Sequence, residues 1–155
     1  CLGMQVATIE YVRHVLGLAD AHSAEFAPRA GHRVFLKLRE LQNVEDMGHN
    51  MRLGAYSCIL KKNSLAYRVY RQERITERHR HRFEFNPEFE YKLENKGMRI
   101  SGKNPERNLV EIVELAGHPW FLGCQFHPEF KSRPLAPHPL FVSFIEQARR
   151  GRTRS

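Results

Sequence analysis

The sequence predicts an α/β domain in which a mixed, mainly parallel sheet is flanked by helices. Three observations favour this class. Apolar residues recur at helical spacing near both ends, short strand candidates lie between them, and residues 120–126 are almost wholly apolar. Such a run suits a strand buried on both faces of a sheet. With 155 residues, 41% of them hydrophobic, the chain fits one compact domain and requires no disulfide scaffold.

The first half of the chain is expected to place one helix before several short strands. Apolar spacing predicts a helix over residues 2–18, and Gly17 marks its end because glycine tolerates a left-handed helix terminus. Strands are expected at residues 33–38, 56–60 and 66–70. Polar loops are expected at residues 20–31 and 41–50, the second of them mobile.

The second half contains a basic, alternating segment, residues 76–85. As a strand it would present Arg78, Arg80 and Arg82 on one face and His79, His81 and Phe83 on the other. A short helix at 87–97 and strands at 99–102 and 109–115, joined by a turn at 103–108, follow. A last helix begins near Pro139, where a missing N–H costs nothing. Its apolar stripe is Leu140, Phe141, Phe144, Ile145 and Ala148.

Composition narrows the classes of partner. The formal net charge of +8, from 25 basic and 17 acidic residues, can indicate nucleic acid or anionic lipid. Much of it lies in residues 68–82 and in the basic tail 149–155, which we expect to be disordered because no apolar residue follows Ala148. Basic tails are more often solvated than binding, so no nucleic-acid partner is expected. No apolar run approaches the ~20 residues of a membrane span, so no membrane partner is expected either.

The cysteines indicate a reducing compartment, and we expect a cytoplasmic protein. Cys1, Cys58 and Cys124 are few, odd in number and widely spaced, which also argues against structural zinc. His79 and His81 share a strand face, but no third ligand is suitably spaced, so no metal is expected.

The segment after the apolar run carries a histidine and a glutamate two residues apart. In extended backbone His127 and Glu129 project to the same side. A carboxylate bonded to one imidazole nitrogen fixes the tautomer and leaves the other nitrogen free to act as a base. Taken alone, such a pair is more often a surface contact at a strand end.

The start of the chain offers a nucleophile. Cys1 opens the first predicted helix, where the positive end of the helix dipole favours a thiolate, and Gly3 permits a tight turn. A buried structural cysteine explains Cys1 equally well. Together with His127 and Glu129, however, it makes a Cys-His-Glu triad plausible.

The two motifs together resemble the signature of a known family. Residues 1–5 (Cys-Leu-Gly-Met-Gln) and 124–130 (Cys-Gln-Phe-His-Pro-Glu-Phe) are similar to the paired signature of class I, triad-type glutamine amidotransferases. The resemblance narrows to the CTP synthase family through residues 5–11, 23–26, 51–54, 77–83 and 118–121. It spans about residues 1–145.

The resemblance implies a role for each site residue. Residues 1–148 would be the C-terminal portion of a glutamine amidotransferase domain, N-terminally truncated and beginning at the nucleophile. Cys1 would attack the side-chain amide of L-glutamine, His127 would act as general base and then acid, and Glu129 would orient it. The Leu2 N–H would supply half of the oxyanion hole. The residues expected to hold the amino-acid end of the substrate are Gln5, Glu25 and Arg82.

The resemblance also implies partners outside the chain. An N-terminal synthetase domain of the same protein would use ATP and Mg to convert UTP to CTP with the released ammonia, in a homo-oligomer. No cofactor is expected in this chain. GTP is expected as an activator, although residues 48–50 (Gly-His-Asn) replace the usual Gly-Gly-Thr. The alternatives are a class I amidotransferase serving another acceptor, or a truncated, non-catalytic relative acting as a binding subunit.

Overall fold

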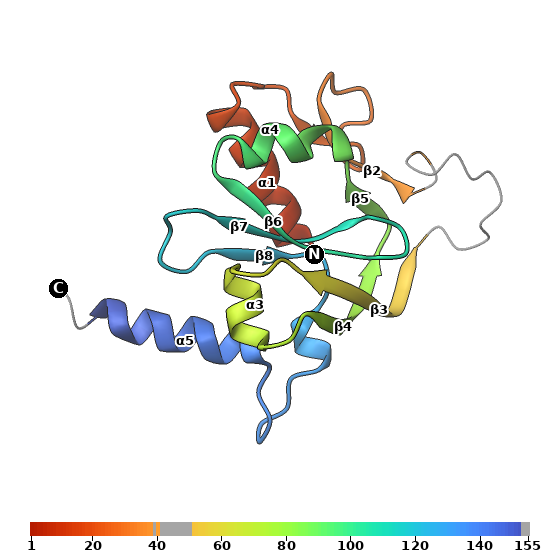
Figure 1. The fold of residues 1–155 in the computed structure, drawn as a ribbon. Coiled ribbons are helices and arrows are strands. Elements are labelled where there is room, and N and C mark those ends of the chain that lie inside the picture. Colours follow the sequence, from red (N-terminus) through yellow and green to blue (C-terminus); the bar gives the residue numbers. More distant parts are fainter. Residues whose placement is uncertain (39, 41–50, 153–155) are drawn as a thin grey trace.

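The computed structural model describes residues 1–38, 40 and 51–152 and contains two sheets flanked by helices (Figure 1). The smaller sheet has the order β1-β2-β5, with β1 His22–Ser23, β2 Arg33–Lys37 and β5 Phe83–Phe85. The larger sheet has the order β4-β3-β6-β7-β8, with β4 Arg74–His81, β3 Arg52–Leu60, β6 Met98–Lys103, β7 Val110–Leu115 and β8 Leu122–Cys124. The helices are α1 Leu2–Val15, α3 Leu65–Tyr70, α4 Glu90–Glu94 and α5 Pro139–Arg152, with 3₁₀ turns at Pro87–Phe89 and Pro128–Phe130.

The α/β class, with helices flanking mixed sheets, is confirmed. Parallel pairing is nevertheless limited to β1 with β2, and every other pairing of the described strands is antiparallel. Connection length excludes parallel pairing for β6-β7 and β7-β8, because a parallel crossover needs a dozen or more residues and residues 104–109 and 116–121 are too few. The mainly parallel arrangement expected from the sequence is therefore not found among these strands.

The core divides into two apolar clusters. One lies between α1, the smaller sheet, α4 and the β6-β7 part of the larger sheet, and is built around Val12, Phe35 and Phe85. The other lies between the larger sheet, α3 and the start of α5, and is built around Leu60 and Phe126. Cys1, the residue immediately before α1, meets the end of β8 between these clusters.

Helix α1 follows the predicted helix but ends earlier. It stops at Val15, and Gly17 adopts a φ of 73°, the conformation for which glycine was expected there. The helix buries Met4, Thr8 and Val12 on one face. The predicted strands at 33–38, 56–60, 99–102 and 109–115 and the turn at 103–108 are confirmed, with β3 beginning four residues earlier than expected. The helix predicted at 87–97 is present but shorter, as the 3₁₀ turn Pro87–Phe89 followed by α4.

The strand predicted at residues 66–70 is wrong, because this segment forms α3. The Ser64 hydroxyl accepts the Tyr67 N–H at 3.0 Å, and the Glu114 carboxylate accepts the N–H groups of the first two helical residues at 2.9 and 2.8 Å. Arg71 ends the helix with a φ of 56°. These capping contacts satisfy N–H groups that a strand would leave to a neighbour.

The basic segment 76–85 splits between the two sheets. Its alternation is confirmed in β4, where His79 and His81 are buried while Arg78 and Arg80 are exposed. The chain leaves the larger sheet at Arg82, and Phe83 enters the smaller one. Residues 74–85 therefore connect the two sheets directly.

The apolar run 120–126 is not the doubly buried strand that the sequence predicts. Only Leu122–Cys124 forms β8, its residues are half-buried, and among the described strands it pairs with β7 alone. The fully buried residues are instead Gln125 and Phe126, immediately after the strand.

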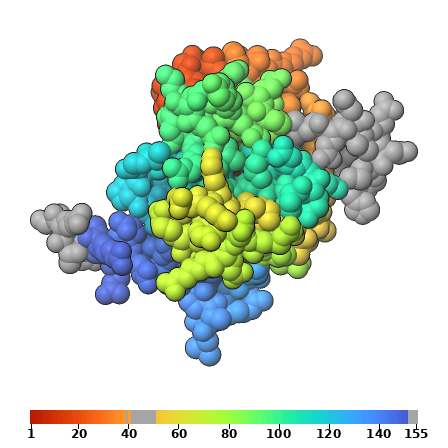
Figure 2. Space-filling view, viewed as in Figure 1, coloured from red at the N-terminus to blue at the C-terminus, as the bar shows by residue number. Residues whose placement is uncertain are grey.

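Helix α5 begins at Pro139 as predicted, but most of its apolar stripe is exposed. Leu140 is buried, whereas Phe144 and Ile145 are 50% and 57% exposed. The helix continues to Arg152, so residues 149–152 are helical and the predicted disordered tail is wrong for them. Figure 2 shows α5, in dark blue, projecting from the body.

Residues 153–155 and the predicted loop 41–50 lie outside the described residues. No helix in the described part of the chain is long and apolar enough to cross a membrane.

Candidate active site

Cys1 lies beside the end of β8 although the two segments are far apart in the sequence. Its α-ammonium donates to the Cys124 carbonyl oxygen at 2.6 Å, and its Sγ accepts a hydrogen bond from Gln125 Nε2 at 3.6 Å. Cys1 is also the N-cap residue of α1, and its side chain makes no capping bond. The thiol is therefore free of the helix backbone and lies at the positive end of the helix dipole.

His127 and Glu129 form the hydrogen-bonded pair expected from their spacing. His127 Nδ1 bonds Glu129 Oε1 at 2.6 Å, and the imidazole stacks on Phe130 with the ring centroids 4.9 Å apart. Burial acts to raise the pKa of Glu129, but the hydrogen bond and charge of His127, together with a backbone hydrogen bond and the positive charge of the Cys1 α-ammonium, outweigh it, and the pKa lies below its ordinary value. The opposite nitrogen, Nε2, is buried and has no hydrogen-bond partner among the described residues.

A hollow of about 370 Å³ opens beside Cys1. Its described lining residues are Cys1, Leu2, Gln5, Glu25, Phe26, Met51, Arg80, His81, Arg82 and Phe83. The hollow thus brings together the predicted nucleophile and all four residues expected to bind glutamine. His127 and Glu129 do not line it.

The hollow has charges of both signs and one unused acceptor. Glu25 and Arg82 are exposed and line it together. Gln5 Nε2 donates to Gln125 Oε1 at 3.2 Å and to the Phe83 carbonyl at 3.3 Å. Gln5 Oε1 is buried and has no partner among the described residues, so it can accept from a ligand.

A buried ionic cluster supports this side of the hollow, and sequence reasoning missed it. Arg52 Nη2 donates to Glu111 at 2.7 Å, Arg52 Nη1 lies 3.3 Å from Glu84, and His81 Nε2 bonds Glu84 at 2.7 Å. Burial raises the pKa of Glu111 to about 7, although Arg52 opposes it. Burial and the nearby Arg52 lower the pKa of His79 to about 2, so that imidazole is neutral. The alternation of β4 was the only sequence signal for the cluster.

No group of three or more His, Cys, Asp or Glu side chains in the described residues could hold a metal ion. His79 and His81 lie side by side, with ring centroids 5.2 Å apart, but their neighbours are the carboxylates that pair with Arg52. The cluster is therefore an ion-pair network.

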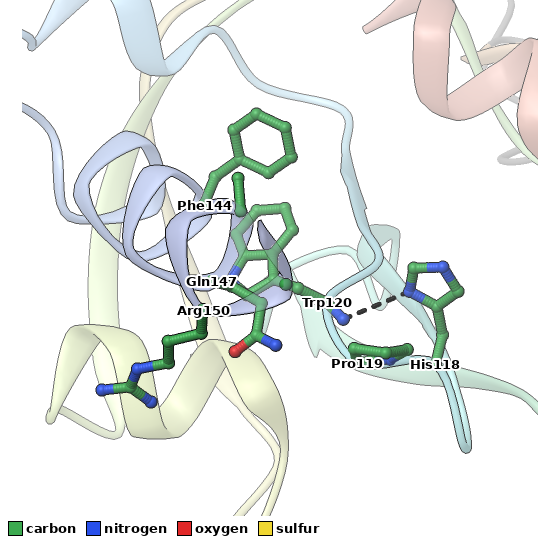
Figure 3. A pocket seen from close by; sticks show the side chains of 8 residues that line it. His118, Pro119, Trp120, Phe144, Gln147 and Arg150 are labelled. Carbon is green, nitrogen blue, oxygen red and sulfur yellow. Dashed lines mark hydrogen bonds between the residues drawn. The ribbon is translucent and has the colours of Figure 1, made fainter. Parts of the chain in front are cut away.

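A larger hollow, of about 630 Å³, lies between α5 and residues 118–120 (Figure 3). Trp120 packs on Phe144 with the ring centroids 5.1 Å apart, and its indole N–H donates to Ser143 at 2.8 Å. The Trp120 backbone N–H donates to His118 Nδ1, the dashed line in Figure 3. None of the described residues that line this larger hollow is a cysteine or carries a carboxylate. We therefore place the chemistry in the smaller hollow beside Cys1.

The described residues place Cys1 beside an amino-acid-sized hollow and hold His127 against Glu129, and comparisons with known proteins identify the family. The model of the glutamine amidotransferase class-I family matches residues 1–147, and the chain belongs to that family. This confirms the resemblance seen in the sequence.

The relatives narrow the comparison to one kind of amidotransferase. The chain is 58% identical over 148 residues to the CTP synthase of Acidobacterium capsulatum and 55% identical over 154 residues to that of Syntrophus aciditrophicus. These matches cover 96% and 99% of this chain but only 27% and 29% of those proteins. The solved glutaminase domain of Trypanosoma brucei CTPS, with bound acivicin, matches with a TM-score of 0.87 at 39% identity, over 96% of this chain and 58% of that one. The chain is thus a module of the glutamine-hydrolysing kind found in CTP synthases.

Proposed function

We propose that this chain hydrolyses glutamine through a Cys1-His127-Glu129 triad and supplies ammonia for the ATP-dependent amination of UTP to CTP. The observation that carries the proposal is the hollow in which Cys1 lies with Gln5, Glu25 and Arg82. An amino acid carries one charge of each sign, and this lining offers a partner for each.

Arg82 binds the α-carboxylate of glutamine, because a guanidinium can pair with a carboxylate through two hydrogen bonds. Glu25 binds the α-ammonium, with Gln5 Oε1 as a second acceptor, which is why that buried atom has no protein partner. With its charged end held there, the substrate directs its side-chain amide toward Cys1.

The reaction uses Cys1 as nucleophile. His127 Nε2 takes the thiol proton, and the Cys1 sulfur attacks the amide carbon while the Leu2 N–H stabilises the developing oxyanion. His127 then returns the proton to the leaving ammonia. Glu129 holds His127 Nδ1–H and so keeps the proton-accepting nitrogen directed at the reacting groups. Water, activated by the same imidazole, hydrolyses the thioester and releases glutamate.

The remaining steps belong to a larger protein. The chain spans under a third of the length of its CTP synthase relatives, and we propose that an N-terminal synthetase domain uses ATP and Mg²⁺ to activate UTP. Activation by GTP, assembly into a homo-oligomer and a cytoplasmic location are part of the same proposal.

The test replaces Cys1 in the full-length protein and compares two nitrogen donors. Cys1→Ala should abolish CTP formation with glutamine but retain it with free ammonia, because the thiol acts only in ammonia release. Equal loss with both donors would contradict this division of labour. Glutamate release without CTP formation in the wild type would indicate another acceptor, and absence of glutamate release would indicate a non-catalytic subunit.

A further inference from the structure

Gln125 occupies a position that neither the triad nor the substrate residues explain. Its side chain is fully buried, at 0% exposure, between Cys1 and Gln5. The carboxamide N–H donates to Cys1 Sγ at 3.6 Å, and the carboxamide oxygen accepts from Gln5 Nε2 at 3.2 Å. Its backbone N–H donates to the Glu111 carbonyl at 2.8 Å, which fixes the residue to β7.

The direction of these bonds matters for the chemistry of sulfur. Gln5 Nε2 donates to the oxygen of Gln125, so the Gln125 NH₂ group is left to donate, and its acceptor is the thiol of Cys1. A donor stabilises a thiolate more than a thiol, since an ionised acceptor forms the stronger bond. In a buried position, with few waters to compete, this preference is enlarged.

The cysteine that precedes Gln125 in the sequence accepts no such hydrogen bond from the described residues. Cys124 is one residue away, and its Sγ acts as a donor to the Phe126 carbonyl at 3.5 Å. Burial raises the pKa of the Cys124 thiol to about 12, so it stays protonated. Cys1 differs from Cys124 in accepting a carboxamide hydrogen bond and in capping a helix.

We propose that Gln125 is a positioning residue that holds the Cys1 sulfur and stabilises its thiolate, and that it links the nucleophile to the substrate-binding Gln5. This inference rests on the proposed function, since it takes Cys1 as the nucleophile. Gln125 does not line the hollow, so it acts on the sulfur and on Gln5 without touching the substrate.

Other titratable or polar groups lie near Cys1, and substitutions at Gln125 leave them in place. They are its own α-ammonium or the peptide N–H in its place, Cys124, Glu129 with its partner His127, and the residues that line the hollow with Cys1, namely Glu25, Arg80, His81 and Arg82. A comparison of variants at position 125 therefore isolates the carboxamide.

The experiment measures the pKa of the Cys1 thiol in the full-length protein from the pH dependence of its alkylation by iodoacetamide, with mass mapping of the alkylated cysteine. Gln125→Met keeps the side-chain length but has no donor. We expect the thiol pKa to rise by about one unit, which means about tenfold less thiolate below the pKa. The matched control is Gln147→Met on α5, which should leave the pKa unchanged.

Kinetics supply a second readout. Glutamine turnover by Gln125→Met should fall in kcat at neutral pH and recover as the pH rises. KM should change less, because Gln5 loses its bond to Gln125 but keeps its bond to the Phe83 carbonyl. Gln125→Glu, nearly identical in shape, should raise the thiol pKa at least as far, because its carboxylate repels a thiolate.

The outcomes separate this inference from the proposed function. Alkylation of Cys1 with an unchanged pKa in a folded Gln125 variant would overturn the inference alone. A wild-type protein in which Cys1 is not alkylated, and whose Cys1→Ala variant still hydrolyses glutamine, would overturn the proposed function. If neither variant at position 125 folds while Gln147→Met does, Gln125 is structural and the positioning role is wrong.

Discussion

Glu111 gives the pH dependence that the structure specifies most closely. Its carboxylate is fully buried against Arg52, and burial raises its pKa from 4.5 to about 7. A carboxyl whose pKa is higher in the folded than in the unfolded chain binds its proton more tightly when folded. Folding is therefore favoured at low pH, and stability falls as pH rises from about 4.5 to about 7.

The size of the effect follows from the two pKa values. A difference of about 2.5 pH units at 1.36 kcal/mol each gives about 3 kcal/mol, lost across that range. Glu111→Gln removes the titrating group, so the variant should lack this part of the pH dependence. At pH 7 the variant is expected to gain stability because it buries no ionised carboxylate at this position. The loss of the Arg52–Glu111 ion pair offsets only part of this gain, because Glu84 still pairs with the Arg52 guanidinium at 3.3 Å.

The assay is urea unfolding of the 155-residue chain at several pH values between 4.5 and 7.5. Trp120 is the only tryptophan and reports unfolding by fluorescence. The quantity compared is the change in unfolding free energy with pH, in the variant minus the wild type. Glu146→Gln, at an exposed position of α5, is the matched control and should reproduce the wild-type slope. If Glu111→Gln also keeps that slope, Glu111 does not bind a proton in this range and our account of the cluster fails.

Two further predictions concern glutamine itself. In the full-length protein, Arg82→Ala and Glu25→Ala should each raise the KM for glutamine about ten- to a hundredfold with a smaller effect on kcat, because a charge-assisted pair contributes roughly 1.5–3 kcal/mol. Arg78→Ala, exposed on β4 but outside the hollow, is the control, and an unchanged KM in both test variants would contradict the binding assignment. The 155-residue chain alone should release glutamate at least about 10²-fold more slowly than a longer chain carrying the remaining part of the domain, because a single oxyanion donor contributes about that much. Equal turnover by the two chains would show that the Leu2 N–H is sufficient as the oxyanion donor.

Much of the fold followed from local patterns. The spacing of α1, the alternation of β4 and the proline that begins α5 each depend on residues within one or two turns, and the structure agrees with all three. The predictions were wrong where a contact with a residue far away in the sequence determines the secondary structure. The segment that forms α3 has an apolar pattern compatible with a strand, but Glu114, 48 residues away, accepts the first N–H groups of the helix.

The sequence by itself determined the family, through two short motifs, and the candidate residues of the site. It could indicate that His127 and Glu129 meet, because they are only two residues apart, although the structure joins them across the 3₁₀ turn Pro128–Phe130 and not along an extended strand. Only the tertiary structure brought Gln125 against Cys1 and Gln5, and only it joined Arg52 to Glu84 and Glu111. The physical reason is that such contacts depend on sheet register and on the burial of polar groups that must find partners, and neither is encoded in the spacing of neighbouring residues.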